Sequence, residues 1–317
     1  MTSKTVSALK LLFATALCFI IVRETILHFN TIELSNLALS KLFSPQFFIF
    51  LVSAVTLVFI NWGLEIYKWQ VLVNSVVAIK FYDAVKAVMS GVSISLFMPN
   101  RTGEFAGRIL FVPADKRIET TVVTFYGSLI QLVITLAFGL VSYFVLQHYH
   151  HFSIPFVNAL FLQINLPVLL IIVVGLILIS FFFRKKLLVL FHSVLLKLKY
   201  IKISPALHAK VWFLSALRFI VFTMQFVLLM LAFGVHGNLI SFFCGASFIL
   251  FATTILPSIS VLEIPLRGGI SFLVMNSFST YASGASVASL LLWCINLGIP
   301  AVFGAIILMF FKFDKWK

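Results

Sequence analysis

Apolar residues occur along this chain in runs long enough to cross a membrane, separated by short polar segments. A helix of about 20 apolar residues spans the hydrocarbon core of a bilayer. The runs therefore predict six transmembrane helices, over residues 8–26, 47–65, 120–146, 166–183, 212–234 and 288–311. No long polar stretch remains, so we expect one integral membrane domain over residues 1–317, with the first run retained as a helix.

Two further apolar stretches are interrupted by polar segments and predict hairpins. Residues 81–97 are too short to cross comfortably, and residues 238–256 end in a polar segment before the last span. Irregular backbone within a bilayer is tolerated only where protein or a water-filled cavity satisfies it. We therefore expect two re-entrant helical hairpins, whose turns contain Pro99, Asn100, Gly103, Pro257, Ser258, Gly268 and Gly269.

Lysines and arginines are concentrated in loops and predict the orientation of the chain. Lys4 and Lys10 precede the first span, and residues 184–186 are all basic. Because basic residues are enriched in cytoplasmic loops, we expect both termini in the cytoplasm. The first hairpin then enters from the cytoplasmic face and the second from the outer face. Residues 1–150 and 160–317 thus have the same order of elements in opposite orientations, which predicts an inverted-topology repeat.

The composition supports an all-α polytopic membrane protein. Hydrophobic residues make up 62% of the chain and charged residues 10%, whereas soluble domains have about 45–50% apolar and about 25% charged residues. A net charge of +14 would suggest a nucleic acid partner in a soluble protein. Here the basic residues lie in loops between spans, so we expect no nucleic acid partner.

Residues with metal-binding chemistry lack the spacing of a metal site. The three cysteines lie in apolar spans without a CxxC or Cys/His pattern. His148, His150 and His151 lie in an expected outer loop without an acidic neighbour, which favours a solvated loop. The chain also has no Walker motif. We therefore expect no metal and no other cofactor.

Five ionisable residues lie in the predicted hairpins. A charged side chain at the bilayer centre costs about 2.5–3.5 kcal/mol on insertion scales, so such groups are commonly paired and functional. Three arginines face two glutamates, which predicts a site for an anion such as phosphate. The alternative is two structural ion pairs, each with Glu four residues before Arg. The residues are Arg101, Glu104, Arg108, Glu263 and Arg267.

Other polar residues in the spans predict structural roles. We expect Glu65 to form an interfacial pair with Lys68. Arg218 is expected to extend to the cytoplasmic face, with a role in substrate binding as the alternative. Gln131 and Asn165 are expected to form hydrogen bonds between helices.

The first hairpin segment resembles a known motif. Pro99-Asn-Arg-Thr-Gly-Glu-Phe-Ala-Gly-Arg108 is similar to the Pro-x-Arg-x-Gly-Glu-x-x-Arg signature of the lysylphosphatidylglycerol synthetase transmembrane (flippase-like) family, with one extra residue before the final Arg. That family includes the membrane domain of the multiple peptide resistance factor. Residues 256–269 resemble the family's later Pro-Ser/Thr, Glu and Arg-Gly element, although family members often have the acid after the arginine.

The resemblance implies a lipid translocase in a bacterial cytoplasmic (inner) membrane. Arg101, Glu104 and Arg108 would line an inner cavity, and Glu263 with Arg267 an outer one. The arginines would hold the phosphate of a phospholipid or glycolipid, while a glutamate engages a cationic or hydroxylated headgroup. Because the chain ends at residue 317, a lipid-modifying enzyme would be a separate partner. The sequence leaves open whether the protein forms a homo-oligomer.

Two other classes of function compete with transport. One is an integral membrane enzyme that acts on a lipid-linked phosphate or sugar, for which Asp83 and Asp115 stand too isolated to form a metal-binding pair. The other is a receptor or assembly scaffold, which does not need charged hairpins within the membrane.

Overall fold

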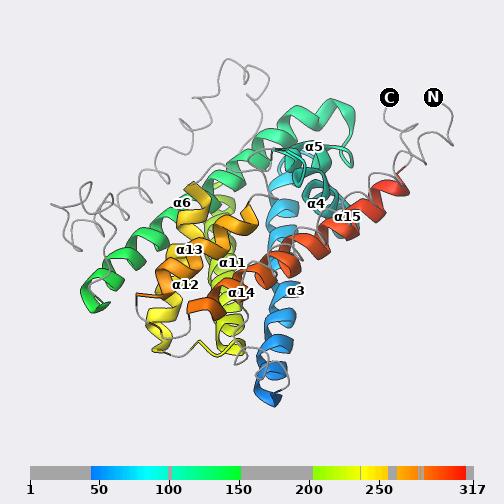
Figure 1. The fold of residues 1–317 in the computed structure, drawn as a ribbon. Helices are drawn as coiled ribbons and strands as arrows, with labels where there is room; N and C mark the ends of the chain where they lie inside the picture. Colours follow the sequence, from blue (N-terminus) through cyan, green and yellow to red (C-terminus); the bar gives the residue numbers. More distant parts are fainter. Residues whose placement is uncertain are drawn as a thin grey trace.

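The part of the chain that the structure describes is entirely helical. The computed structural model describes residues 44–98, 102–150, 203–235, 237–255, 263–277, 279 and 282–311, and no strand occurs among them. Four helical segments are long and apolar enough to cross a membrane (Figure 1): α3 (Pro45–Val73), α6 (Arg117–His150), α11 (Pro205–Ala232) and a run from Ala282 to Met309. The chain is therefore a helical membrane protein.

The prediction of six spans is confirmed only in part. The four long helices correspond to the predicted spans 47–65, 120–146, 212–234 and 288–311. The predicted spans 8–26 and 166–183 lie outside the described residues. The last long segment is made of α14 (Ala282–Trp293), a π-helical turn (Cys294–Gly298) and α15 (Ile299–Met309), which follow one another without a break.

The two long helices α3 and α11 begin in the same way. Ser44 and Ser204 occupy their N-cap positions, and each is followed by a proline in the first turn. Each serine Oγ accepts a hydrogen bond of 3.1 Å from the backbone N–H three residues on. Such a cap satisfies a donor that the helix leaves unpaired, and proline tolerates this position because it lacks an N–H.

Two short helices, α4 (Phe81–Ser95) and α5 (Gly103–Ile109), form an antiparallel pair. A Cβ on Gly103 would lie 2.7 Å from the carbonyl oxygen of Ile94, and one on Gly91 would lie 2.8 Å from that of Glu104. The backbones approach this closely because these positions have no side chain. The pair folds back as the predicted first hairpin does, while Pro99, Asn100 and Arg101 at its tip lie outside the described residues.

The second pair of short helices is α12 (Leu239–Ile255) and α13 (Glu263–Met275), which contact each other. Pro257 and Ser258, predicted in its turn, lie outside the described residues. The carbonyl of Gly268 accepts a 2.9 Å hydrogen bond from Ser286 of α14, whereas Gly269 faces open space. Gly268 therefore belongs to a packed helix face and not to a turn.

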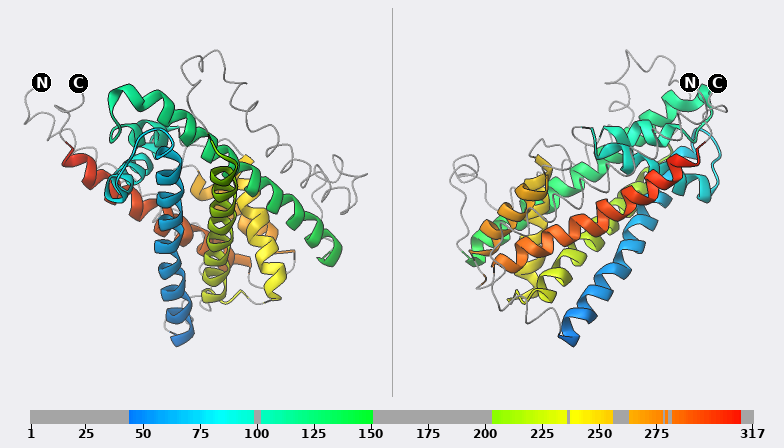
Figure 2. Two further views of the ribbon diagram at one scale, coloured as in Figure 1. Left: turned by 180° about the vertical axis from the view of Figure 1, so that it is seen from behind. Right: turned by 45° about the vertical axis from the view of Figure 1, so that its right-hand side comes forward.

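Helices from the first half of the chain pack against helices from the second half. Helix α3 lies along α11, α4 packs against α15, and α12 packs against α6. Figure 2 shows α3 and α11 side by side, while in Figure 1 α6 and the α14–α15 run slant across them. Gly304 of α15 meets the backbone of Met89 in α4, and Gly139 of α6 meets Phe251 in α12. Each of these two contacts thus joins a glycine of a long helix to a short helix from the other part of the chain.

Large apolar side chains also cover the outer surface, as expected for contact with lipid. Phe59, Phe213, Leu273 and Phe303 are all exposed on different helices. Since lipid tails are as apolar as these side chains, the close fit between helices depends on small residues and on buried polar contacts.

We expect Gly103→Ala to destabilise the α4–α5 pair, because its new Cβ would overlap backbone atoms that cannot move independently. Overpacking of this kind costs about 1–3 kcal/mol. The measurement is thermal unfolding of the purified protein in detergent. Gly63→Ala in α3 is the matched control, because a Cβ there meets nothing within 4 Å. An equal melting temperature for the two variants would contradict the close α4–α5 packing.

Candidate functional site

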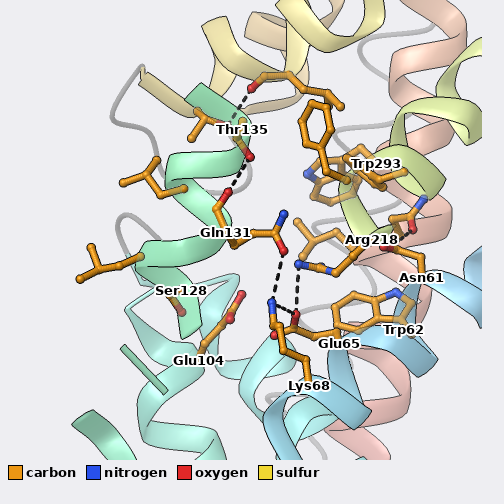
Figure 3. A pocket seen from close by; sticks show the side chains of 18 of the residues that line it. Asn61, Trp62, Glu65, Lys68, Glu104, Ser128, Gln131, Thr135, Arg218 and Trp293 are labelled. Carbon is orange, nitrogen blue, oxygen red and sulfur yellow. Dashed lines mark hydrogen bonds and ion pairs between the residues drawn. The ribbon is translucent and has the colours of Figure 1, made fainter. Parts of the chain in front are cut away.

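A cavity of about 490 Å³ lies where the long and short helices meet. Its walls come from both ends of the described chain, since α3, α5 and α6 contribute side chains together with α11, α13 and the π-helical turn. Figure 3 shows these side chains pointing toward one another. The ionisable residues in the wall are Glu65, Lys68, Glu104, Arg108, Arg218 and Arg267.

Glu65 is the centre of a buried charge cluster. It is 6% exposed, and its carboxylate contacts cations from three helices. Oε2 lies 2.7 Å from Nζ of Lys68 and 3.2 Å from Nη1 of Arg218, and Oε1 lies 3.0 Å from Nη2 of Arg108. A charge buried with such partners is stabilised by them, and the loss of one partner leaves the others uncompensated. Glu65 therefore ties α3 to α5 and α11.

Arg108 connects the two carboxylates of the cavity. Its Nη2 donates to Oε1 of Glu65 at 3.0 Å and to Oε2 of Glu104 at 2.9 Å, and the residue is only 3% exposed. The pair between Glu104 and Arg108, expected from their spacing of four residues, is thus present. The guanidinium also lies 6.0 Å from the ring of Trp69. Glu104 is more exposed than Glu65, with 23% of its side chain accessible.

A chain of hydrogen bonds extends the cluster toward α6 and α11. Nζ of Lys68 donates to Oε1 of Gln131 at 3.2 Å, and Nε2 of Gln131 donates to the carbonyl of Ser215 at 3.3 Å. The prediction that Gln131 links helices is therefore confirmed. Asn165 lies outside the described residues.

A second, uncharged group of polar side chains lines the cavity. Nδ2 of Asn61 donates to Oδ1 of Asn296 at 2.9 Å, and Nδ2 of Asn296 donates to the carbonyl of Leu292 at 3.2 Å. Asn296 lies in the π-helical turn, a local widening of the helix that is common at functional sites. The indoles of Trp62 and Trp293 lie beside this pair (Figure 3).

The structure brings three of the predicted site residues to one cavity. Glu104, Arg108 and Arg267 all line it, although they come from helices far apart in the sequence. Arg101 and the side chain of Glu263 lie outside the described part of the chain, so their predicted roles stay predictions. The predicted division into an inner and an outer group of charges is not visible for these three residues, because they share the same cavity.

The predicted pair between Glu65 and Lys68 is confirmed, but both residues are buried at the cavity, where they also contact residues from other helices. The prediction for Arg218 was wrong. Arg218 turns to Glu65, with its guanidinium 5.7 Å from the ring of Trp62, and does not extend to the cytoplasmic face. The carboxylate of Glu65 on the neighbouring helix α3 lies within reach of Arg218 and compensates its charge inside the protein. The useful sequence signal was the occurrence of Glu65 and Arg218 well inside two apolar runs.

The charge of the cavity favours an anion. Its described lining contains four cationic side chains and two carboxylates, and both carboxylates already contact cations. Guanidinium groups bind phosphate or carboxylate through paired hydrogen bonds. Nε of Arg108 and of Arg218 has no hydrogen-bond partner among the described residues, so each retains a donor for a ligand. No group of His, Cys, Asp and Glu among those residues is arranged to hold a metal.

Comparison with known proteins identifies no relative, since no family model, curated protein or solved structure matches the chain.

We expect Glu65→Gln to destabilise the protein, because it leaves Lys68, Arg108 and Arg218 close together without their central anion. Breaking a buried ion pair in this way costs about 3–5 kcal/mol. The measurement is unfolding in detergent. Asp83→Asn is the control, because Asp83 forms a 2.6 Å pair with Lys86 that is partly exposed, and such pairs contribute at most about 1 kcal/mol.

A double variant separates charge from packing at the same site. Glu65→Gln combined with Arg218→Gln removes one charge of each sign, so we expect it to recover part of the stability lost in Glu65→Gln. Equal or greater destabilisation in the double variant would show that the charge balance at Glu65 is not what stabilises the three helices.

Proposed function

We propose that this protein is a flippase-like translocase that moves a phospholipid or a lipid-linked headgroup across the membrane through the charged cavity. The observation that carries the proposal is a cavity whose described lining has more cationic side chains than carboxylates, set between helices long enough to span a bilayer. Buried ionisable groups are expensive within a membrane and commonly mark a substrate pathway. A lipid phosphate is the anion that such a protein meets in its surroundings.

An inverted repeat, also proposed, is supported by the pairing of helices. In such a repeat α3 corresponds to α11, α4 to α12, and α6 to the α14–α15 run. The contact between α4 and α15 then corresponds to the contact between α12 and α6, and the α3–α11 contact corresponds to itself. The serine-proline starts of α3 and α11 lie 160 residues apart. Two such halves with a site at their interface are typical of transporters that expose the site to each side of the membrane in turn.

Re-entry of the short helices into the membrane is part of the proposal. Helix α4 has 15 residues and α5 has 7, whereas about 20 residues are needed to cross. The 13 residues of α13 are likewise too few. Short helices that pack between spans and contribute Arg108 and Arg267 to the cavity are suited to moving a substrate locally. We place both termini in the cytoplasm of a bacterial cell, with the hairpins entering from opposite faces.

Glu104 has a specific role in the proposed transport. It shares Arg108 with Glu65, but it is the more exposed carboxylate and lies on the short helix α5. A lipid phosphate that approaches Arg108 would therefore displace Glu104 and leave Glu65 in place. Return of Glu104 to Arg108 would then help to release the lipid. Binding is reversible in this scheme, because the protein's own carboxylate competes with the phosphate.

We expect Glu104→Gln to abolish or strongly reduce lipid translocation, because an amide competes poorly with a bound phosphate for Arg108. The measurement is the movement of a fluorescent phospholipid in proteoliposomes, read by quenching of the label in the outer leaflet. Asp115→Asn is the matched control, since Asp115 is exposed and lies outside the cavity. Unchanged transport by a folded Glu104→Gln variant would refute the proposed role.

A further inference from the structure

The cavity has two chemically different regions. The charged region consists of the cluster around Glu65, whereas Asn61, Asn296, Trp62 and Trp293 form an uncharged region. The two regions border each other at Arg218, whose guanidinium lies 5.7 Å from the ring of Trp62. In Figure 3, Lys68 and Glu104 lie on one side of the open space and Trp293 lies across it. A ligand that fills the cavity would therefore meet both regions, and this inference rests on the proposed function.

The described carboxylates of the cavity are already engaged. Glu65 contacts three cations and Glu104 contacts Arg108. A headgroup with its own amine would enter a space whose described lining has two more cations than carboxylates. Like charges repel strongly where water is excluded, because the effective dielectric constant is lower than in bulk. The charged region thus selects for the phosphate and against a cationic headgroup.

The uncharged region has buried hydrogen-bonding atoms without partners. Asn61 is 1% exposed and its Oδ1 has no partner, while Trp293 is 2% exposed and its indole N–H has none. The indole N–H of Trp62 is also unsatisfied. An unpaired buried polar group costs about 1–3 kcal/mol, and a ligand that satisfies it recovers part of this cost, since a net hydrogen bond contributes about 0.5–1.5 kcal/mol.

Hydroxyl groups match this set of atoms. One acceptor and two donors on side chains of the uncharged region have no partner among the described residues, and a hydroxyl both donates and accepts a hydrogen bond. An ammonium group can only donate, so it could not satisfy either indole. Adjacent hydroxyls on one headgroup could reach Asn61 and the indoles together. We infer that the cavity binds a lipid whose phosphate carries a neutral polyol, such as glycerol or a sugar, and discriminates against an amine-bearing headgroup.

The experiment compares lipids that differ only in the headgroup. Dihexanoyl phosphatidylglycerol and dihexanoyl phosphatidylethanolamine are titrated into the full chain in nanodiscs, with inorganic phosphate as a third ligand and calorimetry as the readout. We expect the glycerol lipid to bind about tenfold more tightly than the ethanolamine lipid, which corresponds to one or two net hydrogen bonds. We also expect it to bind more tightly than inorganic phosphate.

Variants locate the discrimination. Trp62→Phe combined with Trp293→Phe removes both indole donors, which a hydroxyl can satisfy and an ammonium cannot. This variant should lower the affinity for the glycerol lipid to that for the ethanolamine lipid, while the affinity for inorganic phosphate is unchanged. The double variant Asn61→Leu/Asn296→Leu removes both amides together. It should lower the affinity for both lipids, because the oxygen of Asn61 accepts from a hydroxyl and from an ammonium alike. Asn276→Leu is the control, since Asn276 is exposed and lies outside the cavity.

The outcomes separate this inference from the proposed function. Equal or tighter binding of the ethanolamine lipid overturns the polyol inference but leaves translocation standing. Inorganic phosphate that binds as tightly as the glycerol lipid overturns the inference as well, because the headgroup is then not recognised. Binding of neither lipid, together with unchanged transport by Glu104→Gln, refutes both.

Discussion

One buried carboxylate holds the centre of this protein together. Glu65 contacts Lys68 on its own helix, Arg108 on α5 and Arg218 on α11. Each cation would repel the others if the carboxylate were absent, and Lys68 and Arg108 are almost fully buried. Glu65 thus helps to fix the positions of α5 and α11 relative to α3, and with them the shape of the cavity that these helices line.

Close backbone contacts make this arrangement possible. Gly91 and Gly103 let α4 and α5 approach until their backbones touch, which brings Glu104 and Arg108 to the cavity. Gly139 likewise lets α6 approach α12, and Gly304 lets α15 approach α4. Lipid tails give no hydrophobic driving force for these contacts, so dispersion at close range and the buried polar bonds must hold the helices. The glycines and the charge cluster therefore act together.

The cavity combines stability and proposed transport in the same residues. Glu65 is fully engaged and stabilises the helices, while Glu104 shares its cation and is partly exposed. In the proposed transport, this division would let one carboxylate exchange with a ligand without loss of the other. The uncharged pair Asn61 and Asn296, at the π-helical turn, belongs to the region where we infer recognition of a headgroup by hydrogen bonds.

The sequence by itself determined the helical membrane class, because long apolar runs have few alternatives in a bilayer. It also determined the four described spans, the short helices α4 and α12, and the presence of Glu104, Arg108 and Arg267 as charges in apolar surroundings, all three of which line the cavity. Only the tertiary structure decided that Glu65, Lys68 and Arg218 join them. The partners of Glu65 on other helices lie 43 and 153 residues away along the chain, and neither periodicity nor spacing reports such pairings. Local patterns specify which side chains are costly to bury, whereas helix packing specifies which partners compensate them.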